Sequence, residues 1–284
     1  MLYLKKIVIA LILVITLTTL IGCNQDKSSD SDAKTSTVNV VGSTSVTPIA
    51  TKLAEEFAKK NENIKVDVQG VGSTPGVKAA NDGTADIGMA SRSLKPGEKE
   101  WNLTEHVIAY DGIVIAIHPN NSITDIDLET AKKIFSGEIK NWEEIGGKDE
   151  EILVVSRESG SGTRGAFEDI LKLYEKNSDG KKISIVTKDA LIADSNGAVM
   201  ANISKKENAI GYLSLSYLND SIKDLKINGV EASVQNILDN KYKISRPFLF
   251  VTKGDISEGG KEYLDFVLSD EGQKIVGEKL IPIK

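Results

Sequence analysis

Three short segments of the sequence combine hydroxyl side chains with glycine just before a predicted helix. They read Gly42-Ser43-Thr44-Ser45, Gly72-Ser73-Thr74-Pro75 and Gly160-Ser161-Gly162-Thr163. Backbone N–H groups and hydroxyls at a helix N-terminus bind anions, and glycine lets the backbone approach a ligand closely. The chemistry that these residues offer is reversible binding of a small anion by uncharged donors.

Each segment taken alone is also explained as an ordinary helix cap, because serine or threonine near a proline is typical of a helix start. The three differ from isolated caps in that each follows a predicted strand, directly or through a loop. In open α/β sheets, ligands lie beyond the carboxyl ends of strands. We therefore expect the three segments to converge on one tetrahedral anion.

Three arginines near these segments are candidates for the positive charge of such a site. Arg157 precedes the third segment, Arg164 directly follows it, and Arg92 follows a predicted strand. A guanidinium donates two parallel hydrogen bonds to an oxyanion. The alternative for each arginine is a surface or interdomain salt bridge.

The composition excludes several other kinds of site. The chain has 284 residues, a net charge of −6, one cysteine and two histidines. The acidic balance gives no basic footprint for nucleic acid. A single cysteine allows no intrachain disulfide and no thiolate metal cluster, and His106 and His118 form no HExxH motif. We expect no metal, no cofactor, no nucleic-acid partner and no catalytic residue.

The N-terminus has the pattern of an export signal. Lys5 and Lys6 precede an apolar run over 7–21. A membrane-spanning helix needs about 20 apolar residues, so this shorter run is typical of the apolar region of a signal peptide. The run ends in Leu20-Ile21-Gly22-Cys23, which resembles a bacterial lipobox. We predict a signal peptide over 1–22, a lipid on Cys23 and a polar tether over 23–36. The alternative is a plain signal peptide with an incidental cysteine.

From residue 37 onward, strands and helices alternate. Apolar alternation and β-rich runs predict strands, and apolar stripes with helix-start signals predict helices. The strands are expected over 37–41, 64–68, 85–90, 107–117, 152–155, 210–213 and 248–251, and the helices over 48–60, 75–82, 128–135, 164–174, 260–268 and 270–279. This order predicts an α/β protein with helices on both faces of its sheets. No linker marks a domain boundary, so strands are expected to cross between domains.

The sequence resembles a known family at five stretches, and these follow one another in the family's order. The stretches cover 42–48, 70–77, 86–92, 134–142 and 157–164, with Ser195-Asn196-Gly197 and Arg246-Pro247-Phe248 in addition. The family is that of the phosphate-binding lipoproteins of bacterial high-affinity phosphate ABC transporters, the PstS family. The stretches over 134–142 and 157–164 are specific, and the resemblance spans the whole chain after the signal peptide.

The resemblance implies a two-lobed periplasmic-binding-protein fold of type II, with mixed sheets flanked by helices and two crossings between lobes. The crossings are expected near Ile115 and Ser245. Lobe 1 would comprise 38–115 plus 245–284, and lobe 2 would comprise 116–244. A member of this family would be a monomer, anchored through Cys23 to the outer face of the cell membrane. It would capture inorganic phosphate and deliver it to ABC-transporter permease subunits.

The resemblance also implies which residues bind phosphate. By position, the contacts from lobe 1 are Thr44, Ser45 and Ser73, and Arg92 is predicted to belong to the phosphate-binding residues of this lobe. The contacts from lobe 2 are Arg157, Ser161, Gly162 and Thr163. Hydroxyls and backbone N–H groups would donate to phosphate oxygens, and Arg157 would supply charge.

One residue departs from the best-known members, which carry an aspartate at the position of Arg92. There the aspartate accepts the phosphate proton, whereas an arginine cannot accept a hydrogen bond. A subgroup of the family carries Ser-Arg at this point. The proton would then be read by a serine or threonine hydroxyl, or by a carboxylate such as Glu158, whose other role would be to pair with Arg157.

Two further functions stay open at this point. The departure at Arg92 allows a binding protein for another tetrahedral oxyanion, such as sulfate or molybdate. An exported hydrolase is the other alternative, although Ser161 lies in Ser159-Gly160-Ser161-Gly162, which is not a G-x-S-x-G elbow.

Overall fold

The computed structural model describes residues 35–284, and these form one unit by their internal contacts. The predicted signal peptide and the predicted lipidation of Cys23 lie outside the described residues. None of the helices within 35–284 has the length and apolar character needed to cross a bilayer.

The N-terminal part of the long mixed sheet holds three parallel strands, which run side by side in the order β2-β1-β3. Their bounds are β1 Ser36–Gly42, β2 Ile64–Gly70 and β3 Ile87–Ala90. Val38 and Val40 of β1 are fully buried, as expected for a strand covered on both faces. The helices of this part are α2 Thr47–Ala58, α3 Ser73–Asn81, α4 Pro96–Lys99, α9 Glu258–Leu268 and α10 Asp270–Val276.

The other part of the sheet continues in the order β4-β10-β6-β9, and β11 pairs with β4. The strands here and in the two small sheets beside it are β5 Asp125–Ile126, β6 Leu153–Arg157, β7 Tyr174–Lys176, β8 Lys182–Ser184, β9 Leu191–Ala193, β10 Ala209–Ser214, β11 Lys223–Asp224 and β12 Lys226–Ile227. Its helices are α5 Leu128–Ser136, α6 Gly162–Leu171, α7 Asn196–Ile203 and α8 Val234–Leu238, with 3₁₀ turns at Trp142–Ile145 and Leu215–Tyr217.

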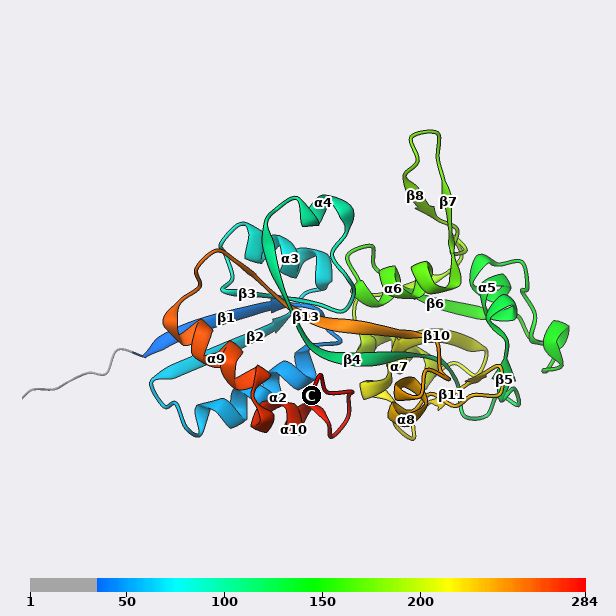
Figure 1. The fold of residues 1–284 in the computed structure, drawn as a ribbon. Coiled ribbons are helices and arrows are strands. Elements are labelled where there is room, and N and C mark those ends of the chain that lie inside the picture. The colour runs from blue at the N-terminus through cyan, green and yellow to red at the C-terminus, as the bar shows by residue number, and fades with distance from the viewer. Residues whose placement is uncertain (1–34) are drawn as a thin grey trace, which may run out of the picture. The chain divides into compact units, whose positions relative to one another are not determined.

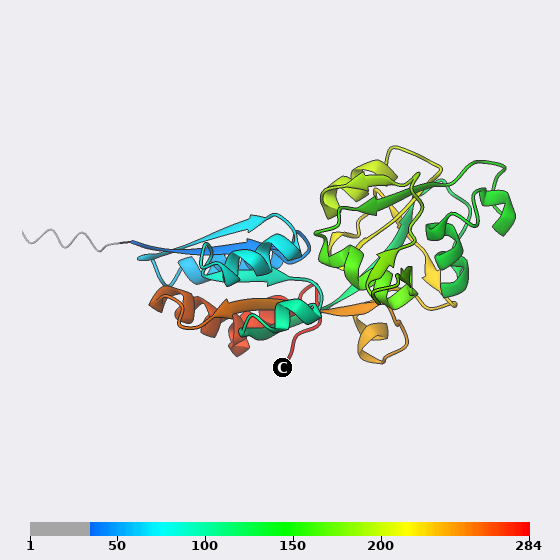
Figure 2. The ribbon, with the colours of Figure 1, turned by 90° about the horizontal axis from the view of Figure 1, so that it is seen from above.

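Two long antiparallel strands join the two parts (Figure 1). They are β4 Leu103–Ile117 and β13 Ser245–Lys253. From Leu103 to Gly112, β4 pairs with β13, whereas from Ile113 onward its residues pair with β10. Figure 2 shows the same two strands as the links between the parts.

The buried apolar residues form two separate main clusters that correspond to these parts. One cluster contains Phe57 and Tyr263, whose rings meet edge-on at 5.5 Å. The other contains Phe167 and Tyr212, whose rings stack at 4.0 Å. Each part therefore has its own core, and the paired strands β4 and β13 connect them.

The α/β class and every predicted strand are confirmed, with shifts at the ends. The predicted helix over 164–174 is wrong at both ends. It begins at Gly162, because the Ser161 hydroxyl accepts from the N–H of Arg164, and it ends at Leu171, because Lys172 takes a left-handed conformation with φ 54°. The sequence patterns missed the helices α4, α7 and α8, the strands β5, β9, β11 and β12, and the hairpin β7–β8, because these short elements carry little periodicity.

Gly76 sets how closely α3 packs on the end of β1. A Cβ at this position would lie 2.4 Å from the Cα of Gly42 and 2.5 Å from the carbonyl oxygen of Val41. These are backbone atoms, so they cannot turn aside as a side chain would. The absence of a side chain at Gly76 therefore allows the start of α3 to lie against the end of β1.

We predict that Gly76→Ala destabilises the fold by about 1–3 kcal/mol, because α3 must move away from the β1 backbone. The matched control is Gly97→Ala, since a Cβ at Gly97 would have no atom within 4 Å. The free energy of unfolding from urea titration measures both. Equal stability of the two variants would contradict this account.

Candidate functional site

The three hydroxyl–glycine segments lie together at the carboxyl ends of β1, β2 and β6. Ser45 Oγ lies 2.8 Å from Thr163 Oγ1, which joins the first segment to the third. A Cβ on Gly162 would lie 2.1 Å from Ser73 Oγ, so the second and third segments also meet there. Ser45, Ser73, Thr163 and Gly162 are all buried.

A serine outside the three segments completes this group. Ser43 donates to Ser91 Oγ at 2.9 Å, and the Ser91 N–H donates to Ser73 Oγ at 3.1 Å. We call the buried side chains of Ser43, Ser45, Ser73, Ser91 and Thr163 the hydroxyl cluster. They come from four separate segments of the chain, so only the tertiary fold brings them into contact.

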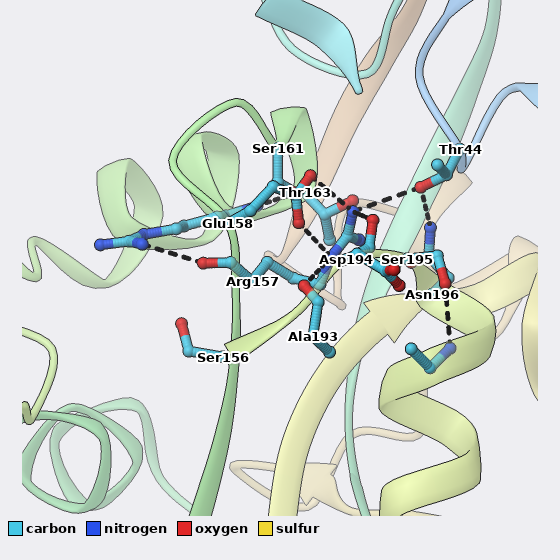
Figure 3. A network of polar contacts seen from close by, with 12 residues as sticks. Thr44, Ser156, Arg157, Glu158, Ser161, Thr163, Ala193, Asp194, Ser195 and Asn196 are labelled. Carbon is cyan, nitrogen blue, oxygen red and sulfur yellow. Dashed lines mark hydrogen bonds and ion pairs between the residues drawn. The ribbon is translucent and has the colours of Figure 1, made fainter. Parts of the chain in front are cut away.

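Arg157 reaches this region from the end of β6 and is 1% exposed. Its Nε and Nη2 donate to both carboxylate oxygens of Glu158, at 2.9 and 3.0 Å, and Nη2 also lies 3.3 Å from Thr44 Oγ1 (Figure 3). Its Nη1 is buried and has no hydrogen-bond partner within residues 35–284. A buried guanidinium donor without an acceptor is costly, so it marks a place where an anion would be stabilised.

Ser161 starts helix α6 beside Arg157. Its Oγ accepts from the N–H of Arg164 at 3.2 Å, and the serine is 4% exposed. The N–H groups of Gly162 and Thr163 belong to the first turn, where an α-helix offers no backbone acceptor. These two donors and the positive end of the helix dipole lie next to the hydroxyl cluster.

Arg92 has other partners than the hydroxyl cluster. Its Nη1 and Nη2 each donate to one oxygen of Glu98 at 2.7 Å, and further bonds go to the carbonyl of Ser93 and to Thr74 Oγ1. Arg92 and Glu98 are 6% and 5% exposed. The structure therefore places Arg92 in a buried ion pair beside the cluster.

Two residues for which the sequence predicted no role contact the hydroxyl cluster. Asn196, at the start of α7, donates to Ser45 Oγ at 2.9 Å and to Thr44 Oγ1 at 3.1 Å. Arg246, on β13, donates to Ser45 Oγ at 3.0 Å and pairs with Asp111 at 2.9 Å. The family resemblance over 195–197 and 246–248 pointed to Asn196 and Arg246, but it implied no function for either residue.

The charges around the cluster are balanced. Arg92, Arg157 and Arg246 each form an ion pair with a carboxylate, respectively Glu98, Glu158 and Asp111. Three positive and three negative groups leave no formal surplus. An anion bound here would be held by oriented hydrogen-bond donors and helix dipoles, which set the local potential independently of the net charge of −6.

The two histidines lie in other surroundings. His106 Nε2 is 3.0 Å from Thr252 Oγ1 on β13, and His118 Nδ1 accepts from the N–H of Asn120. Ser161 has no hydrogen bond to a histidine among the described residues. A nucleophile needs a base within hydrogen-bond reach, so the arrangement gives no support to a serine hydrolase.

The chain matches the family model described as a PBP superfamily domain over residues 27–271. It is 32% identical over 283 residues to the phosphate-binding protein PstS of Borreliella burgdorferi, covering 97% of both chains. It is 31% identical to the phosphate-binding protein PstS of Bacillus subtilis, covering 92% of this chain and 85% of the other.

Solved structures show the same fold. A candidate phosphate ABC transporter substrate-binding protein from Clostridium perfringens, solved with bound phosphate, is 44% identical with a TM-score of 0.82, covering 87% of this chain and 100% of the other. An ABC-type phosphate transport receptor from Vibrio cholerae is 34% identical with a TM-score of 0.72, covering 87% and 100%. The expected mixed α/β fold of type II periplasmic binding proteins is thereby confirmed.

The Arg92–Glu98 pair predicts a specific loss of stability in acid. Burial would raise the pKa of Glu98, but the bonds from Arg92 and the Lys95 N–H outweigh it and hold this pKa below its usual value. A depressed folded-state pKa stabilises the fold above the unfolded value of 4.5 and loses that contribution as pH falls through the folded value.

We expect the unfolding free energy of Glu98→Gln to depend less on pH below about pH 5 than that of the wild type. Urea titrations at a series of pH values between about 3 and 7 measure this dependence. The control is Glu100→Gln, because Glu100 is exposed and has no ion pair among residues 35–284. Parallel pH profiles for wild type and Glu98→Gln would refute the role of this pair.

Proposed function

Because the chain belongs to the PBP superfamily and, within it, to the PstS family of phosphate-binding proteins, we propose that it captures inorganic phosphate and delivers it to the permease of an ABC transporter. One observation carries the assignment of the site: the buried Arg157, whose Nη1 has no hydrogen-bond partner among residues 35–284, lies beside the place where the starts of three helices bring hydroxyl and N–H donors together. The chain would act by binding and release, without turnover.

The proposed phosphate contacts are Thr44, Ser45, Ser73, Arg157, Ser161, Gly162 and Thr163. What supports this set is that its members come from the three converging segments and from the strand end beside them. Arg92 would act indirectly, because Glu98 already accepts hydrogen bonds from both of its Nη atoms.

The two lobes of the proposed receptor are residues 38–115 plus 245–284, and residues 116–244. Two separate apolar cores support this division. Contacts from Thr74 N–H to the carbonyl of Gly160, at 3.0 Å, and from Tyr217 hydroxyl to the carbonyl of Thr44, at 2.9 Å, join them. Hinge closure of this kind lets two half-sites meet around one ion.

The place of action follows from the relatives and from the N-terminal pattern. We propose that the chain is an extracytoplasmic monomer held at the outer face of the membrane by a lipid on Cys23. The lipobox-like stretch over 20–23 and the polar stretch after it support the anchor.

Selectivity for phosphate over sulfate would depend on acceptors, because at neutral pH only phosphate carries a proton to donate. Glu158 and the cluster hydroxyls have lone pairs near Arg157. A site with an acceptor left unpaired rejects a ligand that cannot donate. Sulfate and molybdate remain the second candidate ligands, since Arg92 stands where other members carry a carboxylate.

The direct test is calorimetric titration of the purified protein, freed of bound anion, with phosphate and, in parallel, with sulfate. We expect tight one-to-one binding of phosphate and no heat from sulfate. Comparable binding of both anions would indicate a general oxyanion receptor. Binding of neither would overturn the assignment of the site.

Within that titration, Ser161→Ala is expected to weaken phosphate binding by about 1.5–3 kcal/mol, or roughly tenfold to 150-fold, through loss of a hydrogen bond to a charged ligand. Ser161 also caps α6, so the matched control is Ser233→Ala. Ser233 caps α8 in the same way, through a bond from the Asn236 N–H. Unchanged affinity in Ser161→Ala would remove this residue from the site.

A further inference from the structure

A second buried ion pair lies next to the hydroxyl cluster, between the strands that join the two cores. Arg246 of β13 and Asp111 of β4 are direct antiparallel partners, 3% and 1% exposed. Arg246 Nε and Nη2 donate to Asp111 Oδ2 at 3.2 and 2.9 Å. β4 changes its pairing partner just beyond, between Gly112 and Ile113. The pair therefore lies at the crossing itself.

The other side of the Arg246 guanidinium faces the cluster. Nη2 donates to Ser45 Oγ at 3.0 Å, and Nη1 lies 3.4 Å from Ser91 Oγ. Ser45 Oγ is the atom that also contacts Thr163. One hydroxyl thus separates Arg246 from the segment that carries the proposed phosphate contacts.

Arg246 also lines a cleft at the start of α6. This cleft has a volume of about 910 Å³, and its lining includes Ser161, Arg92 and Arg246. Arg246 is therefore close both to the hydroxyl cluster and to the helix start that carries Ser161.

Stability of the fold does not by itself explain why the Arg246–Asp111 ion pair is buried here. Replacing a buried ion pair by apolar groups is often neutral or stabilising, so the pair is not explained by the fold alone. Burial lowers the pKa of Arg246, and the nearby positive charge of Arg157 lowers it further, against the effect of Asp111. The two positive charges therefore repel each other, and an anion bound near both would reduce that repulsion.

We propose that Arg246 is a second anion-binding guanidinium acting with Arg157, and that Asp111 is the positioning residue that holds it against Ser45 and Ser91. This inference rests on the proposed function. Ser214 of β10 fixes the other carboxylate oxygen, since its hydroxyl donates to Asp111 Oδ1 at 2.9 Å. A bound anion would then contact β13 directly through Arg246 and β4 indirectly through Asp111. Both strands that connect the two cores would therefore interact with it.

The principal test is the double variant Arg246→Met with Asp111→Asn, which removes both charges and keeps an oxygen for Ser214. We expect the Kd for phosphate to rise by about tenfold or more, as for loss of a charged hydrogen-bond donor. The control is Lys60→Met with Glu271→Gln, which removes an ion pair of 2.7 Å whose two residues do not line this cleft. Its phosphate Kd should change less than about threefold, because contacts away from the bound ligand contribute little to affinity.

The role of Asp111 is tested by Asp111→Asn alone, which leaves Arg246 charged and without its counter-ion. We expect the ratio of the sulfate Kd to the phosphate Kd to fall in a buffer acidic enough for phosphate to be mainly the monoanion, because added positive charge then favours the dianionic sulfate. A purely structural role would weaken both anions in parallel. Parallel changes, or none, would refute the positioning role.

The outcomes separate this inference from the proposed function. Phosphate binding by wild type together with an unchanged Kd in the folded Arg246→Met/Asp111→Asn variant would overturn the inference alone. Absence of phosphate binding by wild type would overturn the proposed function. Thermal unfolding of each variant shows that it is folded before it is titrated.

Discussion

The antiparallel pairing of β4 with β13 is the constraint on which the other features depend. These two strands are the sheet connection between two apolar cores. The carboxyl ends of the neighbouring parallel strands β1 and β2 lie close to the segment that follows β6. Helices start at each of those ends, so their first N–H groups and capping hydroxyls meet in one buried place. Donors that would be costly to bury singly would be satisfied together by one anion.

The buried charged side chains near the site are also compensated by their neighbours. Each buried arginine near the site has a carboxylate partner, so burial costs less than it would for lone charges. The partners differ in what they leave free. Glu98 binds both Nη atoms of Arg92 and leaves its buried Nε without a partner among the described residues, as Glu158 leaves Nη1 of Arg157. Asp111 leaves Arg246 able to reach two serines. Neutral overall charge and free donors together suit reversible binding, since the ligand must also leave.

Close backbone packing supports this arrangement. Gly76 allows α3 to pack closely on the end of β1, and Gly162 allows the start of α6 to pack closely on Ser73. A side chain at either position would occupy space that backbone or hydroxyl atoms now fill. The glycines of the predicted segments therefore serve packing as well as access for the ligand.

The sequence by itself determined the α/β class, the order of the longer strands along the chain, the presence of a helix after each of the three hydroxyl–glycine segments, and the family. Those features depend on local patterns: apolar periodicity, capping residues and glycine beside hydroxyls. Only the tertiary structure decided which arginines face the cluster. Arg92 seemed well placed beside its strand, yet Glu98, six residues on, binds it. Asp111 and Arg246 are 135 residues apart and pair only because β4 and β13 run antiparallel in one register. No local pattern encodes such a pairing, because strand register depends on how two distant strands share a core.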